Sequence, residues 1–301
     1  MSRVLVIGDY LIDRYVFYQQ QRYDPANSQA PVVKLVSDCV VLGGAGNFVR
    51  NLQSLCRGRA SVEFFYVDRH KLNDFPTKKR YFIEDKFIYR EDSNDKIDHD
   101  QDLIDNFISS IKDGDYVVIS DYHKGTINES DIERIITRCN ELSNVTTFID
   151  TNFVKSCHKR CSWLKINTLT SQHYHSTKNS FDIAKELSNN FCCNTIITRG
   201  STGLSFCSAN RELIRVLKEE DTQFIDSIGA GDACLAGLVA AIIDNKPLGD
   251  ALIYADVCGH LSTHNIGTVD CLDKMKVDKK IRSIKVSENE TSNGVSWLHY
   301  E

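Results

Sequence analysis

The sequence lacks any run of about eighteen consecutive apolar residues, the length that a membrane-spanning helix needs, so we expect no membrane span. It also lacks an excess of positive charge, because 36 lysines and arginines are outnumbered by 41 acidic residues and the net charge is -5. No global basic field is available to hold DNA or RNA, and we expect no nucleic-acid partner. An anionic small molecule would have to be bound by local features of the chain.

Paired cysteine motifs are also missing. The chain has 11 cysteines, an odd number, and they do not form C-x-x-C blocks. No apolar leader resembles a signal peptide, because a strand pattern, Arg3–Gly8, begins at once. We therefore expect reduced thiols in a cytoplasmic protein.

Three familiar motifs are absent, and each absence argues against a class of protein. There is no Gly-Lys-Ser/Thr of a Walker loop, and Gly8 is followed by Asp9 rather than by the Gly-x-Gly-x-x-Gly of NAD-dependent oxidoreductases. His260 and His264 are spaced as i and i+4, but His-Glu-x-x-His is missing, so we predict surface or core histidines rather than a zinc site. The sequence predicts no metal held by a dedicated set of protein ligands.

What the sequence does contain is an alternation of strand-like and helix-like segments. Short apolar runs predict strands at Val4–Gly8, Val62–Val67, Tyr116–Ser120, Thr146–Asp150, Thr195–Thr198 and Leu204–Cys207. Helical spacing of apolar residues predicts helices at Gln101–Lys112, Ser130–Leu142 and Asp232–Asp244. Such alternation is typical of βαβ units, so we expect an α/β fold with a mostly parallel central sheet flanked by helices.

Two regions and the C-terminal end do not follow this alternation. Residues 13–41 have no helical period and residues 78–92 read as extended strands, so we expect both to form a small β lid on the main domain. From residue 277 to 301 the chain is charged and then rich in serine and asparagine, which indicates a C-terminal tail. The alternative is that Trp297 and Tyr300 dock on the domain.

The strongest chemical signal is Gly229-Ala230-Gly231-Asp232, which opens directly onto an apolar helical pattern. Small residues at a helix N-terminus expose backbone N–H groups, and the helix dipole adds partial positive charge, so this turn suits a phosphate. The carboxylate of Asp232 at its mouth has the chemistry to accept a proton from an attacking hydroxyl. The alternative is an ordinary helix start at which Asp232 is the N-cap.

This segment and two others resemble the ribokinase-like (PfkB-type) carbohydrate kinases. Asp226-x-x-Gly-Ala-Gly-Asp232 matches the late signature of that family. Gly8–Asp13 looks like its first strand, and Gly43-Gly44-Ala45-Gly46-Asn47 matches its glycine pair and asparagine. The resemblance runs through nearly the whole chain. It implies a single kinase domain, residues 1–276, that transfers the γ-phosphate of ATP to a sugar hydroxyl.

The resemblance also implies roles for individual residues. Asp232 would be the catalytic base, and the N–H groups of Gly229, Ala230 and Gly231 would stabilise charge on the phosphoryl oxygens. The implied sugar-binding residues are Asp13, Gly43, Gly44 and Asn47. The implied nucleotide-binding residues are Asn167, Thr198, Gly200 and Asp226. The implied cofactors are ATP and Mg²⁺, with K⁺ held near Asp226. An ordinary β-turn is the alternative around Gly200.

Within the family, the chain most resembles the kinase domain of bacterial heptose 7-phosphate kinases. Gly8–Tyr15, Ala30–Lys34 and Ser120–Gly125 are similar to segments of those kinases. This implies a sugar phosphate as substrate, with heptose 7-phosphate first, phosphorylated on its anomeric oxygen O1. The candidates for binding the phosphate of the substrate are Arg14, Lys34, Arg90 and Lys124. The alternative for each is a solvated surface charge.

Two of the chain's departures from the family pattern are at single positions. The family carries Asn-x-x-Glu before the nucleotide site, whereas Asn167-Thr168-Leu169-Thr170 has threonine in place of the acid. Heptose kinases have Asp-Pro-Lys after the middle strand, whereas Asp150-Thr151-Asn152 lacks the lysine, although Lys155 lies nearby. Two hypotheses follow. One is an active but divergent kinase, and the other is a catalytically impaired relative that binds nucleotide or sugar phosphate without efficient transfer.

The expected lid also bears on the oligomeric state. Relatives often dimerise by pairing their β lids, which covers exposed strand edges. Residues 78–92 are rich in tyrosine and phenylalanine and suit such a homodimer, while a monomeric lid is the alternative. The expected partner is a small-molecule sugar or sugar phosphate, with no nucleic acid and no membrane.

Overall fold

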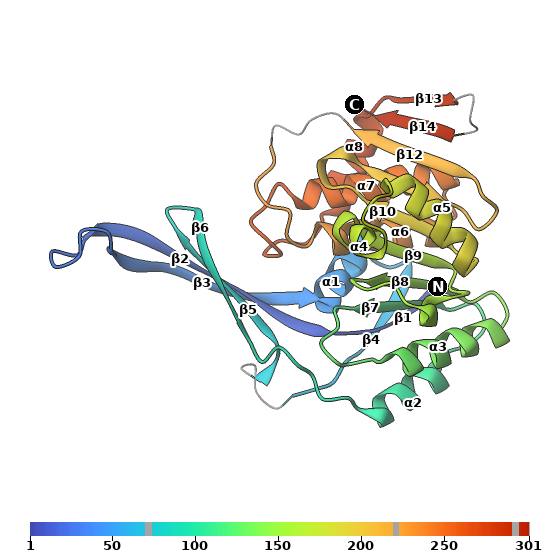
Figure 1. Ribbon diagram of the computed structural model, residues 1–301, viewed down its shortest axis with the longest axis horizontal. Helices are drawn as coiled ribbons and strands as arrows, with labels where there is room; N and C mark the ends of the chain where they lie inside the picture. The colour runs from blue at the N-terminus through green and yellow to red at the C-terminus, as the bar shows by residue number, and fades with distance from the viewer. Residues whose placement is uncertain (70–73, 219–222, 291–294, 301) are drawn as a thin grey trace.

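The computed structural model describes residues 1–69, 74–218, 223–290 and 295–300, and it shows an α/β body with a long β extension on one side (Figure 1). The strands of the body are β1 (Ser2–Gly8), β4 (Ala60–Phe65), β7 (Tyr116–Asp121), β8 (Thr146–Thr151), β9 (Trp163–Asn167), β10 (Asn194–Thr198), β11 (Leu204–Cys207), β12 (Leu213–Lys218), β13 (Val286–Glu290) and β14 (Val295–Tyr300). The strands of the extension, which is the expected lid, are β2 (Tyr10–Tyr23), β3 (Pro31–Gly44), β5 (Thr77–Ile83) and β6 (Lys86–Ser93). The helices are α1 (Ala45–Leu55), α2 (Gln101–Ser110), α3 (Glu129–Glu141), α4 (Thr168–Tyr174), α5 (Ser180–Phe191), α6 (Ala230–Ile243), α7 (Leu248–Ser262) and α8 (Lys274–Ser283).

The strands form two separate sheets. In the described part of the chain, the body sheet has the order β13-β14-β12-β11-β10-β9-β8-β7-β1-β4, and the lid sheet has the order β3-β2-β5-β6. From β4 to β10 every neighbouring pair is parallel, whereas β11 pairs antiparallel with both β10 and β12. The expected α/β fold, with a mostly parallel sheet and a β lid, is confirmed.

Alternating side chains on the body strands fill two cores, one on each face of the sheet. In β1, Val4 and Val6 belong to the core formed with α1, α6 and α7, whereas Leu5 and Ile7 belong to the core formed with α2, α3 and α5. A sheet covered on both faces needs strands that are apolar throughout, which explains the apolar runs in the sequence. Most of α6 is buried from Asp232 onward, whereas Ala230 and Gly231 at its N-terminus are half-buried.

The β2–β3 hairpin of the lid grows out of the body with almost no linker. β1 ends at Gly8 and β2 begins at Tyr10, so the single residue Asp9 separates body from lid. On the return, β3 ends at Gly44 and α1 begins at the next residue. Strands β2 and β5 pair in parallel, with Asp13 opposite Lys78. The two extended regions expected from the sequence therefore lie side by side in one sheet.

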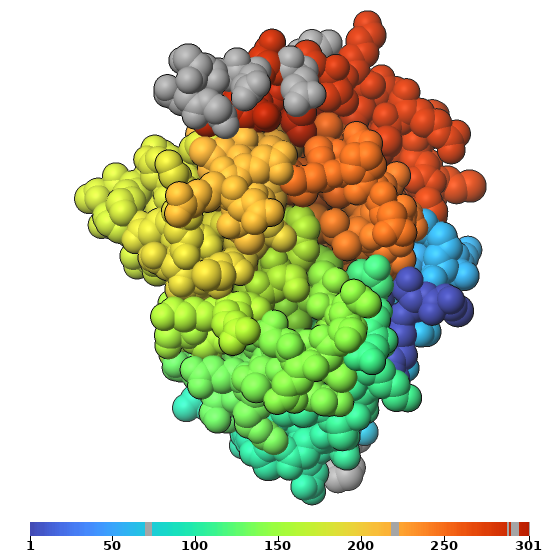
Figure 2. Space-filling view, turned by 90° about the vertical axis from the view of Figure 1, so that its right-hand side faces the viewer, coloured from blue at the N-terminus to red at the C-terminus, as the bar shows by residue number. Residues whose placement is uncertain are grey.

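The C-terminal end differs from the tail that the sequence indicated. The expected boundary at residue 276 falls inside α8, and β14 pairs in parallel with β12, so the last strands extend the body sheet. Tyr300 is buried, and its hydroxyl donates a 2.7 Å hydrogen bond to Asp256 on α7. In Figure 2 the red end of the chain lies against the body. Leu298 and Tyr300 of β14 are buried, and this burial stabilises the strand although the residues around it are mostly polar. Residues 291–294 and 301 lie outside the described part.

Among the described residues, no helix combines the length and hydrophobicity needed to cross a bilayer. No three histidine, cysteine, aspartate or glutamate side chains among them are grouped so that they could hold a metal ion. All 11 cysteines are described and have free thiols.

Candidate active site

The start of α6 faces a cavity of about 900 Å³ in the body. Gly229 has φ 79°, a left-handed conformation that favours glycine, and it turns the chain so that the helix begins at Ala230. Residues 229–232 all line the cavity, so the expected phosphate-binding turn borders an open space. The other lining residues come mostly from the carboxyl ends of the parallel strands and from α7: Asp121, Tyr122, Asp150, Asn152, Lys165, Asn167, Thr168, Leu169, Thr198, Gly200, Ser201, Gly203, Phe224, Ser227, Cys234, Asp256, Gly259, His260 and Thr263.

Asp232 lies in the first turn of α6, with 3% of its surface exposed. Its Oδ2 accepts a 2.8 Å hydrogen bond from Asn47 Nδ2, and its Oδ1 accepts one of 2.5 Å from the Tyr122 hydroxyl. Burial, and then the negative charge of Asp150, raise the pKa of Asp232 to about 6. The N-cap of α6 is Gly229, so the alternative that Asp232 caps the helix is wrong. A carboxyl group with this pKa is suited to accept a proton near neutral pH.

A buried lysine, Lys165, lies beside the same turn. Asp150 and Lys165 are register partners in the pairing of β8 with β9, and the Lys165 Nζ lies 2.8 Å from Asp150 Oδ2. The ammonium group also lies against Gly231, because a Cβ atom on that glycine would come within 2.8 Å of Nζ. Burial acts to lower the pKa of Lys165, but Asp150 and other nearby groups outweigh it and the pKa is raised. The lysine is therefore a fixed positive charge.

The loop after β7 is held in place by Asp9, which is completely buried. Its carboxylate accepts hydrogen bonds from the backbone N–H groups of Tyr122 at 2.8 Å, Lys124 at 3.0 Å and Thr126 at 3.1 Å. Burial raises the pKa of Asp9, although the hydrogen bonds from Lys124 and Thr126 act in the opposite direction. The three bonds fix the loop so that the Tyr122 side chain reaches Asp232.

The residues expected to bind a sugar meet where the lid joins the body. Gly43 lies directly against Asp13, because a Cβ atom on Gly43 would be 2.4 Å from Asp13 Oδ2. Gly44, with φ 55°, is the N-cap of α1, and Asn47 extends from the first turn of that helix to Asp232. The four expected residues and the turn before α6 therefore form one continuous region.

Two cations from the lid reach this region, and the sequence did not indicate either. Arg80 forms a buried ion pair with Asp13, at 2.6 Å between Nη1 and Oδ1, and its guanidinium lies over the ring of Tyr15. Thr268 donates a 3.1 Å hydrogen bond to the other oxygen of Asp13. Lys78 is half-buried nearby, and its burial lowers its pKa. Asp13 neutralises the charge of Arg80, so Lys78 makes the inner face of the lid positively charged.

Two of the four basic residues predicted to bind the substrate phosphate are not brought to the site. Arg14 pairs with Asp38, and it lies on the face of β2 opposite to Asp13, because successive strand residues point to opposite faces. Lys34 is exposed on β3, where its register partner is Gln19. The prediction for Arg14 and Lys34 is corrected because the pleat and the length of the lid direct both away from Asp232.

The other two basic residues lie closer to the site. Arg90 and Lys124 both act electrostatically on Lys78, which places them near the inner face of the lid. Arg90 pairs with Asp92 at 2.7 Å, and Lys124 pairs with Asp95. Each therefore already has a carboxylate partner in this structure.

Three of the residues expected to bind nucleotide line the cavity: Asn167, Thr198 and Gly200. Asn167 is the N-cap of α4, and its side chain accepts a 2.8 Å hydrogen bond from the backbone N–H of Thr170. Thr170, which stands in place of the expected acid, is buried in the first turn of that helix. The asparagine therefore has a clear structural function, whichever ligand the cavity holds.

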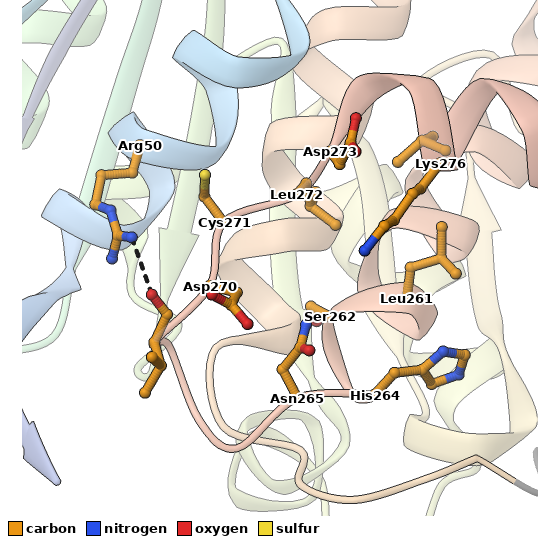
Figure 3. Close-up of a pocket in the computed structure, with 12 residues that line it drawn as sticks. Arg50, Leu261, Ser262, His264, Asn265, Asp270, Cys271, Leu272, Asp273 and Lys276 are labelled. Atoms are coloured by element: carbon orange, nitrogen blue, oxygen red, sulfur yellow. Dashed lines mark hydrogen bonds between the residues drawn. The ribbon is translucent and has the colours of Figure 1, made fainter. Parts of the chain in front are cut away.

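Asp226, the fourth of these residues, is not among the described residues that line the cavity. Its two oxygens accept backbone hydrogen bonds from Ile228 at 3.1 Å and Gly267 at 3.0 Å, so it ties the turn before α6 to the loop after α7. The same loop borders a second cavity of about 430 Å³, where Arg50 of α1 donates a hydrogen bond to the backbone oxygen of Val269 (Figure 3). None of the expected site residues lines this second cavity.

Sequence analysis missed several side chains of the site: Tyr122, Lys165, Lys78 and Arg80. The clearest unused signal is Lys165, because it interrupts the otherwise apolar run Trp163-Leu164-Lys165-Ile166. A lysine is almost never fully buried unless it is paired, so its place in such a run indicates a specific partner. Lys78 and Arg80 are alternate residues of one strand and therefore share a face.

The fold, this site and a family match together define a carbohydrate kinase, a phosphotransferase with a hydroxyl acceptor. A family profile described as pfkB family carbohydrate kinase matches residues 84–275, and the chain belongs to this family.

Curated proteins with similar sequences carry the name bifunctional protein HldE. One from a Nitratiruptor species is 25% identical over 320 residues, which cover 96% of this chain and 67% of that protein. Another, from Helicobacter pylori (strain HPAG1), is 24% identical over 307 residues, which cover 89% of this chain and 64% of that protein. The chain thus spans about two thirds of the length of these relatives.

Solved structures with a similar fold include two sugar kinases. Phosphofructokinase-2 from Escherichia coli in complex with fructose-6-phosphate has a TM-score of 0.68 at 14% identity, covering 94% of this chain and 100% of that chain. Ribokinase from Thermotoga maritima has a TM-score of 0.68 at 12% identity, with the same coverage of 94% and 100%. At these identities the likeness establishes the ribokinase-like fold alone.

Proposed function

We propose that this carbohydrate kinase transfers the γ-phosphoryl group of ATP to O1 of a sugar phosphate, with heptose 7-phosphate as the first choice. The observation that carries the proposal is Asp232, a buried carboxyl group with a pKa of about 6 at the start of a helix that faces a cavity of about 900 Å³. A cavity of this size is large enough for a nucleotide. Similarity to the HldE proteins supports the choice of a heptose phosphate.

In the proposed reaction, the acceptor hydroxyl lies beside Asp232 and attacks the γ-phosphorus of ATP. The bond between this phosphorus and the β–γ bridging oxygen breaks, ADP leaves, and the hydroxyl proton passes to Asp232. Asn47 and Tyr122 each donate to one oxygen of Asp232 and fix its orientation, while each oxygen keeps a second lone pair. The N–H groups of residues 229–231 stabilise charge on the phosphoryl oxygens.

The acceptor is proposed to lie where the lid meets the body. There Asp13 and Asn47 offer polar contacts to sugar hydroxyls, and Gly43 and Gly44 leave room for a close approach. The positive inner face of the lid favours an acceptor that carries a phosphate. The lowered pKa of Lys78, caused by its burial, means that its ammonium would be stabilised by a bound anion.

The described residues fit a magnesium ion that is bound mainly by the nucleotide. No three ligand side chains among them are grouped around a common point, and Thr170, which stands in place of the family's acid, is buried and is not among the described residues that line the cavity. Asp121 and Asp150 line the cavity and would reach such an ion through water. When bound, Mg²⁺ would neutralise charge on the β- and γ-phosphates. K⁺ beside Asp226 stays a prediction from the family resemblance.

The test is an assay of ADP formation with purified protein and a panel of sugars and sugar phosphates, with Mg²⁺ and with EDTA. We expect ADP formation that depends on Mg²⁺ and is fastest with heptose 7-phosphate. Turnover only with an unphosphorylated sugar would contradict the sugar phosphate. Binding of ATP and of a sugar phosphate without turnover would favour the impaired relative, for which Thr170 is the specific observation.

We also propose that the lid forms a homodimer. Seven large apolar side chains of the lid strands are at least 42% exposed: Tyr23, Leu35, Val36, Val40, Phe87, Ile88 and Tyr89. The lid extends well away from the body, so a second copy can approach it (Figure 1). Pairing two lids would remove this apolar surface from water.

A further inference from the structure

The cavity that holds the start of α6 is poor in positive charge. Of the described residues that line it, Lys165 is the only lysine or arginine. Four of the described lining residues are aspartates: Asp121, Asp150, Asp232 and Asp256. A nucleoside triphosphate would add several more negative charges, so its binding here needs a cation from the protein as well as one from the metal.

Lys165 is placed where that charge is needed. Its Nζ lies within 2.8 Å of the point where a Cβ atom of Gly231 would be, which is on the turn whose N–H groups face the cavity. Its other contact is Asp150, at 2.8 Å, from the neighbouring strand. The ammonium is therefore fixed between a carboxylate and an anion-binding turn.

Packing alone does not require a lysine at this position. The neighbouring residues Trp163, Leu164 and Ile166 are apolar and buried, and only 4% of Lys165 is exposed. A buried ion pair is often no more stable than apolar side chains of similar volume. The pair with Asp150 therefore indicates a function beyond stability.

We propose that Lys165 binds the phosphoryl group during transfer and that Asp150 positions its ammonium. This inference rests on the proposed kinase function. As the acceptor oxygen forms its bond to phosphorus and the bond to ADP breaks, the proton of the acceptor goes to Asp232. Lys165 remains protonated throughout and donates N–H···O hydrogen bonds to the non-bridging oxygens.

Lys155, the lysine closest in sequence to the Asp150-Thr151-Asn152 segment, does not supply this charge. It pairs with Glu129 at the surface, with 43% of its side chain exposed, and it is not among the described residues that line the cavity. Lys155→Met is therefore a matched control, because it removes a lysine from the same region of the chain without touching the cavity.

The first experiment compares Lys165→Met with Lys155→Met and the wild type, by kcat for ADP formation and by calorimetric affinity for ADP. We expect Lys165→Met to lower kcat by about 10²–10³-fold, as the loss of one oxyanion donor does. Its affinity for ADP should stay near that of the wild type, because ADP lacks the transferring group. Lys155→Met should match the wild type in both measurements.

The second experiment uses the pH profile of kcat/KM. The groups that face Asp232 are Asn47 from α1, Tyr122 from the loop after β7, Asp150 from β8 and Lys165 from β9. Of these, the positive charge of Lys165 lowers the pKa of Asp232 and the negative charge of Asp150 raises it. Lys165→Met should therefore move the acidic limb to higher pH, and Asp150→Asn should move it to lower pH.

The outcomes of these experiments test the role of Lys165 and the proposed kinase activity. If Lys165→Met keeps wild-type kcat, or if both variants shift the acidic limb in the same direction, the inference is overturned. If Lys165→Met does not fold, the double variant Asp150→Asn/Lys165→Met leaves no unpaired buried charge, and the same loss of kcat is expected there. A wild-type kcat in the double variant overturns the inference. A wild type that forms no ADP with any acceptor overturns the kinase proposal and this inference together.

Discussion

Asn47 on α1 and Asp232 on α6 are separated by 185 residues, and a 2.8 Å hydrogen bond joins their side chains. The bond links the segment expected to bind a sugar with the segment expected to act on it. Because Asn47 donates through its amide, it orients the carboxylate without neutralising its charge. The site is therefore assembled by the fold rather than contained in one stretch of the chain.

We expect Asp232→Asn to lower kcat by roughly 10²–10⁴-fold, which is the usual contribution of a general acid or base. The amide is nearly isosteric with the carboxylate, so nucleotide binding should persist. The measurement is ADP formation in a coupled assay, together with calorimetric binding of ADP. Asp250→Asn, at an exposed position on α7, is the control and should behave as the wild type. An Asp232→Asn variant with near wild-type kcat would remove the catalytic assignment.

The rate should depend on pH through Asp232. Burial and then the charge of Asp150 raise its pKa to about 6, and a base acts only when it is deprotonated. We therefore expect kcat/KM to be level above this pKa and to fall about tenfold per pH unit well below it. A carboxylate in water would lose activity only near pH ~4, its ordinary range. A profile that stays level down to about pH 4.5 would contradict the raised pKa.

Arg80→Met should destabilise the protein by about 3–5 kcal/mol, because it leaves the carboxylate of Asp13 buried without its partner. The two side chains are 5% and 6% exposed, so solvent cannot take the place of the guanidinium. The measurement is the free energy of unfolding in urea. The double variant Asp13→Asn/Arg80→Met should recover part of the loss. Equal stability of the single and double variants would show that the ion pair is not the cause.

Tyr300→Phe should reduce stability by about 1–3 kcal/mol, because the buried carboxylate of Asp256 loses a hydrogen-bond donor. The change should also increase hydrogen exchange in β14. Tyr23→Phe, on the exposed end of β2, is a matched control for the loss of a hydroxyl. Unchanged exchange in β14 would mean that the hydrogen bond does not secure the strand.

The double variant Val36→Lys/Ile88→Lys should be monomeric, because it places charge on the apolar surface of the lid. Both side chains are exposed, at 64% and 50%, so the fold should be unaffected. The measurement is sedimentation or light scattering at several protein concentrations. Met275→Lys, at an exposed position on α8, should keep the oligomeric state of the wild type. A wild type that is monomeric at all concentrations would rule out the lid dimer.

The main elements of the fold could be predicted because their apolar residues follow regular periods. Val4–Gly8 and Asp232–Asp244 are examples, since the apolar side chains of each are buried in a core. Strand β9 was missed, because Lys165 interrupts its apolar run and is neutralised only by a residue of the neighbouring strand. This ion pair depends on the tertiary structure and cannot be predicted from the spacing of residues along one segment.

Only part of the site could likewise be predicted from the sequence. The turn at Gly229–Asp232 has a local signature, and the structure places it on a cavity. Arg14 was assigned to the site by its charge and its place in a motif, but the pleat of β2 directs it to the opposite face from Asp13. The place of Lys78 and Arg80 in the site could not be predicted, because it depends on the pairing of β5 with β2. This pairing puts Lys78 opposite Asp13, although the two residues are far apart in sequence.

The short connections of β2 and β3 to the body have a mechanical consequence. One residue separates β1 from β2, and none separates β3 from α1, so little backbone is available to absorb a bend. The first turn of α1 carries Asn47, so its hydrogen bond to Asp232 couples the position of the β2–β3 hairpin to the orientation of the proton acceptor.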